Sequence, residues 1–268
     1  MVDKFLNCLR AKPNAKYALI CFPWAGGGSN FYAQWGKKFP DSIEVCGVTL
    51  PGRESRFGEP CSTDAKQIVK DTCSAILNRY PDKDLVFWGH SMGALFSFET
   101  ALLMKKLHHK EPVRMFCSGV SAPHTPERKS LGSKVADMSD SEFIEFLKRL
   151  GGTPEQMISD PEMMKLFLPP LRADYTMIAG FSSEVCGTDP PFSCPIHVFD
   201  GQDDVKHNLE AWKDMTSGET SIQYLPGGHF YLKEAANQSF LISYISKTLG
   251  KQVIIKELCK TKVLEKDS

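Results

Sequence analysis

The chain has 268 residues, 42% of them hydrophobic and 24% charged, and its 32 Lys and Arg residues balance 32 Asp and Glu residues. This is the composition of a globular protein, and the length fits a single α/β domain over residues 1–268. The balanced charge, without a basic run or a zinc-binding pattern, argues against a nucleic-acid partner. The apolar runs are too short to span a membrane and no secretory signal is present, so we expect a soluble, cytosolic protein.

Short runs of β-branched and aromatic residues alternate with segments of helical periodicity. The runs predict strands over residues 17–22, 43–50, 85–88, 113–118, 196–200 and 222–225. Helices are predicted over residues 64–80, 92–107 and 235–249. Strands that alternate with helices pair in parallel, and largely apolar strands are covered on both faces. The sequence therefore predicts an α/β fold, a mostly parallel sheet with helices on both faces.

Residues 124–194 interrupt this alternation, because they contain no convincing strand. Amphipathic pieces at 141–150 and 162–168 predict helices, and Ser139 or Asp140 could cap the first. We expect a helical lid inserted between two strands of the sheet. The Lys-rich residues 251–268 are expected to form a flexible tail.

Ser91 lies in the sequence Gly89-His90-Ser91-Met92-Gly93, which matches the pattern G-x-S-x-G. A strand is predicted directly before it and a helix directly after it, as in a nucleophile elbow, where small neighbours permit a sharp turn. The serine hydroxyl then projects above the sheet at a helix start that favours negative charge. Ser91 is the candidate nucleophile; the alternative is a serine that caps the helix between two turn glycines.

A serine nucleophile needs a histidine base that a carboxylate orients, and after an elbow the chain order is serine, acid, histidine. Among the seven histidines, His229 follows the last predicted strand after a Gly-Gly turn and is the candidate base, whereas His197 lies inside a strand and is expected to pack. Asp200, Asp203 and Asp204 compete for the role of acid. We choose Asp204, with Asp203 second, because Asp200 can simply end its strand.

The tetrahedral intermediate of acyl transfer carries an oxyanion that needs preorganised N–H donors. One is expected from the backbone of Met92, the residue after the nucleophile, and the other from the loop FPWAGGG, where we assign it to Ala25. The glycines 26–28 let this loop turn inward. A phosphate-binding loop is rejected, because neither Gly-Lys-Ser/Thr nor G-x-G-x-x-G fits, and a plain turn remains the alternative.

Six motifs in order resemble the type II thioesterases, which are stand-alone α/β-hydrolases that release or edit acyl chains on carrier proteins. The motifs are FPWAGGG, LPGRESR, FWGHSMG, LRADYTM, GQDD and LPGGHFYL. The resemblance covers about residues 8–249, and FLNCL and EAWKDMTSG are most similar to vertebrate members that act with fatty acid synthase. One departure is Trp24, where bacterial members often have His.

The resemblance implies an α/β-hydrolase fold and the roles of nucleophile, acid and base for Ser91, Asp204 and His229. It also implies hydrolysis of fatty acyl thioesters on the phosphopantetheine arm of the acyl carrier protein domain of fatty acid synthase. The products would be free, medium-chain fatty acids. No metal or cofactor is needed, and we expect a monomer.

Two groups of side chains have open roles. Arg53 and Arg56 in LPGRESR could face a phosphate or the carrier protein, or form salt bridges that anchor the loop. Apolar side chains of the insertion could line the acyl chain, although for most of them packing of the insertion onto the core is the favoured role. These side chains are Phe143, Phe146, Leu147, Met157, Met163, Met164 and Phe167.

Two other functions fit part of this pattern. A general carboxylesterase or lipase would use the same triad on oxygen esters, and a non-catalytic hydrolase-fold protein would only bind acyl carrier protein. The missing secretory signal argues against an extracellular lipase, and the complete set of Ser, Asp and His argues against a non-catalytic protein. The nine scattered cysteines, without a C-x-x-C pair, are expected to be reduced thiols.

Overall fold

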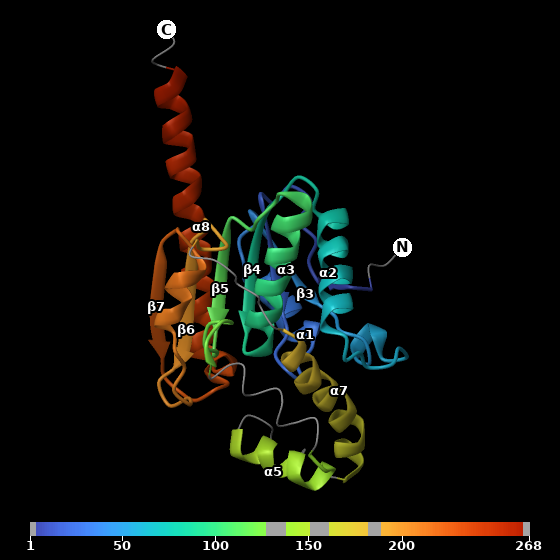
Figure 1. Ribbon diagram of the computed structural model, residues 1–268. Helices are drawn as coiled ribbons and strands as arrows, with labels where there is room; N and C mark the ends of the chain where they lie inside the picture. The colour runs from blue at the N-terminus through green and yellow to red at the C-terminus, as the bar shows by residue number, and fades with distance from the viewer. Residues whose placement is uncertain (1–3, 127–137, 151–160, 182–188, 265–268) are drawn as a thin grey trace.

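Seven strands form one sheet in the order β1-β3-β2-β4-β5-β6-β7 (Figure 1). The computed structural model describes residues 4–126, 138–150, 161–181 and 189–264 of the chain. All neighbouring strands are parallel except β1 and β3, which are antiparallel. The strands are β1 (Leu6–Asn7), β2 (Tyr17–Phe22), β3 (Ile43–Val48), β4 (Asp84–His90), β5 (Arg114–Ser118), β6 (Ile196–Gly201) and β7 (Thr220–Leu225). The six predicted strands are confirmed, whereas β1 was not predicted because a strand of two residues leaves no apolar run.

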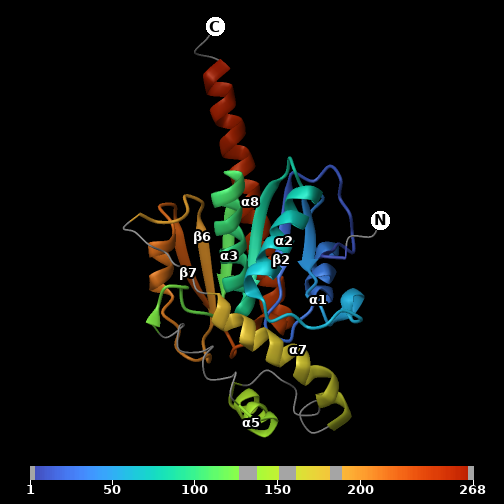
Figure 2. The same ribbon diagram turned by 45° about the vertical axis from the view of Figure 1, so that its right-hand side comes forward.

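Helices cover both faces of the sheet, as predicted (Figure 2). They are α1 (Ser29–Ala33), α2 (Ala65–Arg79), α3 (Met92–His108), α5 (Asp140–Leu150), α7 (Pro161–Gly180) and α8 (Ala235–Leu264). One core lies beneath α2 and α3 and includes Phe87 and Phe96, and a second lies beneath α1 and α8 and includes Trp35 and Trp88. Each such side chain contributes about 1.5–3 kcal/mol when it is fully buried, so the paired cores hold the sheet as a rigid platform.

The helices α5 and α7 lie beyond the carboxyl ends of the strands (Figures 1 and 2). Ser139 rather than Asp140 caps α5, since the Glu142 N–H donates to the Ser139 hydroxyl while the Ser139 N–H donates to the Glu142 carboxylate. This reciprocal pair is a capping box. Helices α5 and α7 therefore lie at the edge of a parallel sheet at which ligands bind in α/β folds, and their role as a lid stays a prediction.

Two helix ends differ from the prediction. A helix was predicted over 162–168, and α7 is longer, since it continues through Pro169 and Pro170 to Gly180. The second half continues because its side chains Met177 and Ile178 are buried in the core beneath α2 and α3. The last helix was expected to end at 249, whereas α8 runs to Leu264. The flexibility of residues 251–268 stays a prediction. None of the described helices is long and apolar enough to cross a membrane.

Candidate active site

Ser91 occupies a sharp turn between β4 and α3. Its backbone has φ 55° and ψ −121°, a conformation that costs a non-glycine residue about 1–3 kcal/mol. The Ser91 N–H donates to the Ser118 carbonyl of β5 over 2.7 Å, which ties the strained residue to the neighbouring strand. The predicted nucleophile elbow thus has its expected geometry.

The glycines on either side of Ser91 are required by close backbone contacts. A Cβ added at Gly89 would overlap the Gly93 carbonyl, and a Cβ added at Gly93 would overlap the carbonyl of Phe22 at the end of β2. The same contact brings the FPWAGGG loop, which follows Phe22, against the elbow. Because Phe22 and Gly89 are register partners, the two loops begin side by side.

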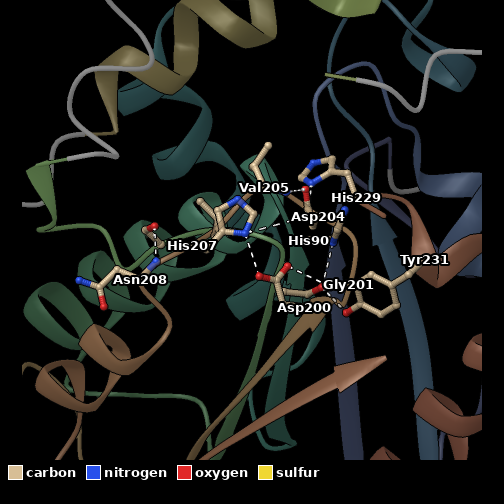
Figure 3. A network of polar contacts seen from close by, with 12 residues as sticks. His90, Asp200, Gly201, Asp204, Val205, His207, Asn208, His229 and Tyr231 are labelled. Atoms are coloured by element: carbon tan, nitrogen blue, oxygen red, sulfur yellow. Dashed lines mark hydrogen bonds and ion pairs between the residues drawn. The ribbon is translucent and has the colours of Figure 1, made fainter. Parts of the chain in front are cut away.

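His229 and Asp204 form a direct pair at the same edge of the sheet (Figure 3). The Nδ1 atom of His229 lies 2.7 Å from Asp204 Oδ2, and the other Asp204 oxygen accepts the Val205 N–H over 2.7 Å. The Asp204 side chain is only 4% exposed, whereas Asp203 is exposed. Of the two adjacent carboxylates, Asp204 is therefore the one that meets the imidazole.

The bond to Asp204 leaves the other ring nitrogen of His229, Nε2, free for the Ser91 hydroxyl. Among the described residues, Ser91 Oγ makes no hydrogen bond, and catalytic hydrogen bonds of this kind often tighten only when substrate binds. Burial alone would raise the pKa of Asp204, but the hydrogen bond and charge of His229, with the charge of His207, lower it. The carboxylate is thus kept ionised, as a group that stabilises an imidazolium must be.

A second acid and histidine pair lies beside the first (Figure 3). Asp200 Oδ2 is 2.9 Å from His207 Nδ1, and its other oxygen accepts the Gly201 N–H. Burial opposes a proton on His207, but Asp200 and Asp204 together raise its pKa. Asp200 therefore does more than end its strand, and the role of His207 was missed because nothing in the sequence links it to Asp200.

Asp200, Asp204 and His207 have possible ligand atoms within 4.8 Å of one another, a spacing at which a metal ion could be held. Each of these side chains is already engaged in a hydrogen bond within the network of Figure 3. A metal ion here would have to displace the bond that orients His229. The arrangement suits proton transfer better than metal binding.

His90 forms the buried wall behind His229, with ring centroids 4.9 Å apart. Its Nδ1 atom lies 2.8 Å from the Ser118 hydroxyl, which in turn lies 2.6 Å from the Tyr231 hydroxyl. Burial lowers the pKa of His90 well below its ordinary value, so this ring stays neutral beside the candidate base. His90 is fully buried, so its ring is turned into the protein.

The backbone N–H groups of Ala25 and Met92 have no acceptor among the described residues. Met92 is the first residue of α3, where N–H groups lack a partner within the helix and the helix dipole favours negative charge. Ala25 lies in the loop that the elbow contacts. Neither N–H is therefore taken up by a hydrogen bond within the described part of the chain, and their role as oxyanion donors stays a prediction.

Comparison with known proteins bears on the chemistry of this arrangement. The family described as the thioesterase domain matches residues 17–249. The chain belongs to this family. It is 40% identical to the medium-chain S-acyl fatty acid synthase thioesterase of Rattus norvegicus over 92% of this chain and 93% of the relative.

Solved structures agree with the fold. The type II thioesterase BorB of the borrelidin biosynthetic cluster has a TM-score of 0.77 at 30% identity and covers 91% of this chain and 96% of its own. Human thioesterase 2 has a TM-score of 0.69 at 32% identity, covering 88% and 97%. The protein is a thioesterase with an α/β-hydrolase fold.

Asp174 of α7 ties the lid of this thioesterase to the candidate oxyanion loop. Its Oδ2 atom accepts the N–H of Gly26, the neighbour of Ala25, over 2.7 Å. The Arg53 guanidinium binds both Asp174 oxygens at 2.7 and 2.8 Å and donates to the Gly27 carbonyl at 3.0 Å. The Asp174 side chain is only 1% exposed and the Arg53 side chain 10%, so this is a buried, bidentate ion pair.

The segment LPGRESR acts as a scaffold for the same loop. Arg53 pairs with Asp174, and Arg56 pairs with Glu59 at 2.6 Å, so the anchoring alternative is confirmed for both arginines. Glu54 accepts the N–H groups of Ser29 and Asn30 at the start of α1. Neither arginine is left to meet a phosphate.

Trp24, the departure from the bacterial pattern, closes the outer side of the loop. Its ring meets Phe230, the residue after His229, edge to face at 5.7 Å between centroids, and is 8% exposed. The Lys233 ammonium lies 4.3 Å from the Phe230 ring and 5.2 Å from the Trp24 ring. Phe230 in turn meets the His229 ring edge to face at 5.0 Å between centroids, so Trp24 reaches the candidate base through Phe230. His197 is stacked on Phe116 inside the sheet, which confirms its packing role.

The seven candidates for acyl-chain contact do not share one environment. Phe143 and Leu147 form a small cluster with Leu171, against which Phe146 and Phe167 pack. Met164 is buried, whereas Met163 is 36% exposed. Met157 lies outside the described residues. The cluster joins α5 to α7 and is separate from the two cores of the sheet, so a role in acyl-chain binding stays a prediction.

The contacts of Asp174 predict a catalytic effect for its removal. The variant Asp174→Asn cannot accept both the Gly26 N–H and the two Arg53 bonds, so the oxyanion loop should lose its fixed position. We expect kcat to fall by up to about 100-fold, with KM changed little, because small displacements of catalytic groups cost about this much. Steady-state kinetics below the melting temperature of the variant would measure the change.

Glu59→Gln is the matched control, because it disrupts the Arg56 ion pair in the same segment without touching Gly26. This control should leave kcat unchanged. An equal fall of kcat in both variants would show that the segment matters only for stability.

Proposed function

We propose that the protein hydrolyses medium-chain fatty acyl thioesters on the phosphopantetheine arm of the acyl carrier protein of fatty acid synthase, with Ser91, His229 and Asp204 as its catalytic triad. The observation that carries this proposal is the His229–Asp204 pair at 2.7 Å on the sheet edge that bears the strained Ser91 elbow. The substrate assignment is supported by the rat relative, whose name describes a medium-chain fatty acid synthase thioesterase.

In the first step, His229 Nε2 takes the proton of the Ser91 hydroxyl as the oxygen attacks the thioester carbonyl carbon. The carbonyl oxygen becomes an oxyanion that the N–H groups of Ala25 and Met92 stabilise. The carbon–sulfur bond then breaks, and the His229 imidazolium gives its proton to the departing phosphopantetheine thiolate. Ionised Asp204 stabilises the imidazolium throughout this step.

In the second step, His229 takes a proton from water, whose oxygen attacks the acyl–Ser91 ester. A second oxyanion forms in the same site and collapses, releasing the fatty acid while the proton returns to Ser91. All proton transfers are made by side chains that are present in this chain. We expect a soft chain-length preference, since one methylene contributes only about 1–3 kcal/mol in a pocket.

The test compares carriers and chain lengths. Purified protein is given acyl carrier protein charged with acyl groups of increasing length, and matched p-nitrophenyl esters serve as oxygen-ester substrates. We expect kcat/KM to be highest for medium-chain acyl carrier protein, with gas chromatography identifying the released acids. A clear preference for the p-nitrophenyl esters would instead favour a general carboxylesterase. Binding of acyl carrier protein without turnover would favour a non-catalytic protein.

A further inference from the structure

Cys8 and Cys46 face each other at the edge of the sheet. β1 and β3 are antiparallel, with Asn7 opposite Gly47, and the same register sets Cys8 opposite Cys46. Both side chains point to the face of the sheet that α2 and α3 cover, where Cys46 belongs to the core and Cys8 packs against it. The two thiols are therefore cross-strand neighbours.

The hydrogen-bond pattern of this strand pair fixes how close the two residues are. The Thr49 N–H donates to the Phe5 carbonyl, so this facing pair is a hydrogen-bonded one. Pairs alternate along an antiparallel ladder, which makes Cys8 and Cys46 a non-hydrogen-bonded pair, with Cα atoms about 4.5 Å apart. That separation lies within the range of about 4.4–6.8 Å that a disulfide spans.

Two polar side chains, Tyr80 and Glu44, lie beside the pair. The Cys46 Sγ atom is 2.7 Å from the Tyr80 hydroxyl, a contact that disulfide formation would break. The two Sγ atoms and a Glu44 oxygen lie within 4.8 Å of one another. Glu44 is already held, since it accepts the Lys12 N–H and the Tyr80 hydroxyl. It is therefore not a free third ligand, and the pair is better suited to joining sulfur to sulfur than to binding a metal ion.

The two cysteines differ in exposure and in charge. Cys46 is fully buried, whereas Cys8 is half-buried. The hydrogen bond with Cys46 lowers the pKa of the Cys8 thiol, and the positive charge of Arg79 lowers it further. Burial and the negative charge of Glu44 raise this pKa, but the net shift is downward. The half-buried sulfur is thus the more nucleophilic one, an arrangement found at redox-sensitive cysteines.

We propose that Cys8 and Cys46 are a redox-active thiol pair that a hydroperoxide converts into an intramolecular disulfide. The Cys8 thiol releases its proton to solvent, and the thiolate attacks one oxygen of hydrogen peroxide. A sulfur–oxygen bond forms, the oxygen–oxygen bond breaks, and the departing hydroxide takes up a proton from solvent and leaves as water. The Cys46 thiol then attacks the Cys8 sulfenic acid, the disulfide forms and a second water leaves with the Cys46 proton. Two thiols are oxidised while one hydroperoxide is reduced.

The disulfide would close the chain segment that holds the oxyanion loop and α1. Asn7, next to Cys8, donates to the Ser29 hydroxyl at 3.0 Å and to the Asn30 side chain at 2.8 Å, both at the start of α1. The cross-link would fix this edge strand against α1 and restrict the unfolded chain. The oxidised protein should therefore melt a few degrees higher than the reduced protein.

The test uses the full-length, fully reduced protein exposed to hydrogen peroxide, followed by thiol alkylation and peptide mass spectrometry without reductant. We expect a linked peptide containing Cys8 and Cys46, lighter by two hydrogens than the separate peptides and lost again on treatment with dithiothreitol. The melting temperature should rise in the same samples. This readout does not depend on thioester hydrolysis, so it stands or fails separately from the proposed function.

Variants identify the pair. Cys8→Ser and Cys46→Ala should abolish both the linked peptide and the shift in melting temperature, whereas Cys61→Ser, which removes another half-buried cysteine, should keep both. Wild-type protein in which Cys8 becomes sulfinic acid while Cys46 is alkylated would overturn the proposal. Disulfide-linked dimers through Cys8 would overturn it equally, and the wild-type measurement remains decisive if a variant fails to fold.

Discussion

Replacing Ser91 by alanine is expected to lower kcat for thioester hydrolysis by about 10⁶-fold, the loss seen when a serine triad loses its nucleophile. The hydroxyl oxygen of Ser91 is the atom that would form the acyl ester. Among the described residues, Ser91 is the one serine with a positive φ. Alanine keeps the strained backbone and the close glycine contacts, so the fold should survive. Turnover of medium-chain acyl carrier protein measures the loss.

A fluorophosphonate probe separates chemistry from binding, because it labels only an activated serine. Wild-type protein should be labelled and Ser91→Ala should not. Ser97→Ala is the matched control: Ser97 lies in α3 and its hydroxyl donates only to the Ala94 carbonyl, so labelling and turnover should persist. Equal labelling of wild type and Ser91→Ala would contradict the assignment of the nucleophile.

Asp204→Asn should lower kcat by about 10⁴-fold, as the corresponding change does in other serine triads. The amide of asparagine can donate a hydrogen bond to Nδ1 of His229, which would hold the proton on Nε2 and so leave no base facing Ser91. It also removes the negative charge that stabilises the imidazolium. Steady-state kinetics with the same acyl carrier protein substrate would measure the effect.

Asp203→Asn provides a control of the same chemistry one residue earlier in the chain. Asp203 is exposed and is not in contact with His229, so its variant should keep nearly full activity. A large loss in Asp203→Asn with little loss in Asp204→Asn would reverse the assignment of the acid. Intact melting temperatures in both variants would exclude an effect of unfolding.

The parts of the site that follow from strand order could be predicted from the sequence. Ser91, Asp204 and His229 each come shortly after a predicted strand, and parallel strands bring such positions to one edge. The sequence could not separate Asp203 from Asp204, because neighbouring side chains in a turn differ only in direction. The bond from Val205 to Asp204 sets that direction, and it is visible only in three dimensions.

Asp174 shows a different limit of sequence reasoning. The motif LRADYTM was recognised, but the acid in it was given no role. A signal existed, since Asp174 lies three residues from both Leu171 and Met177 on one apolar helix face, where a buried acid needs a partner. The sequence does not reveal its partners, Arg53 and a backbone N–H of the glycine loop, because both lie more than a hundred residues earlier in the chain.

Pro169 and Pro170 divide α7 into two parts with different attachments. Proline has no N–H, so the carbonyls of Lys165 and Leu166 lack their usual helical donors, and the helix is weakest at this point. The part after the prolines is held by the Asp174 contacts with the glycine loop. The part before them is held by the packing of Phe167 and Leu168 on the Leu171 cluster, so a substitution there should disturb α5 first and reach the ion pair with Arg53 only through Leu171.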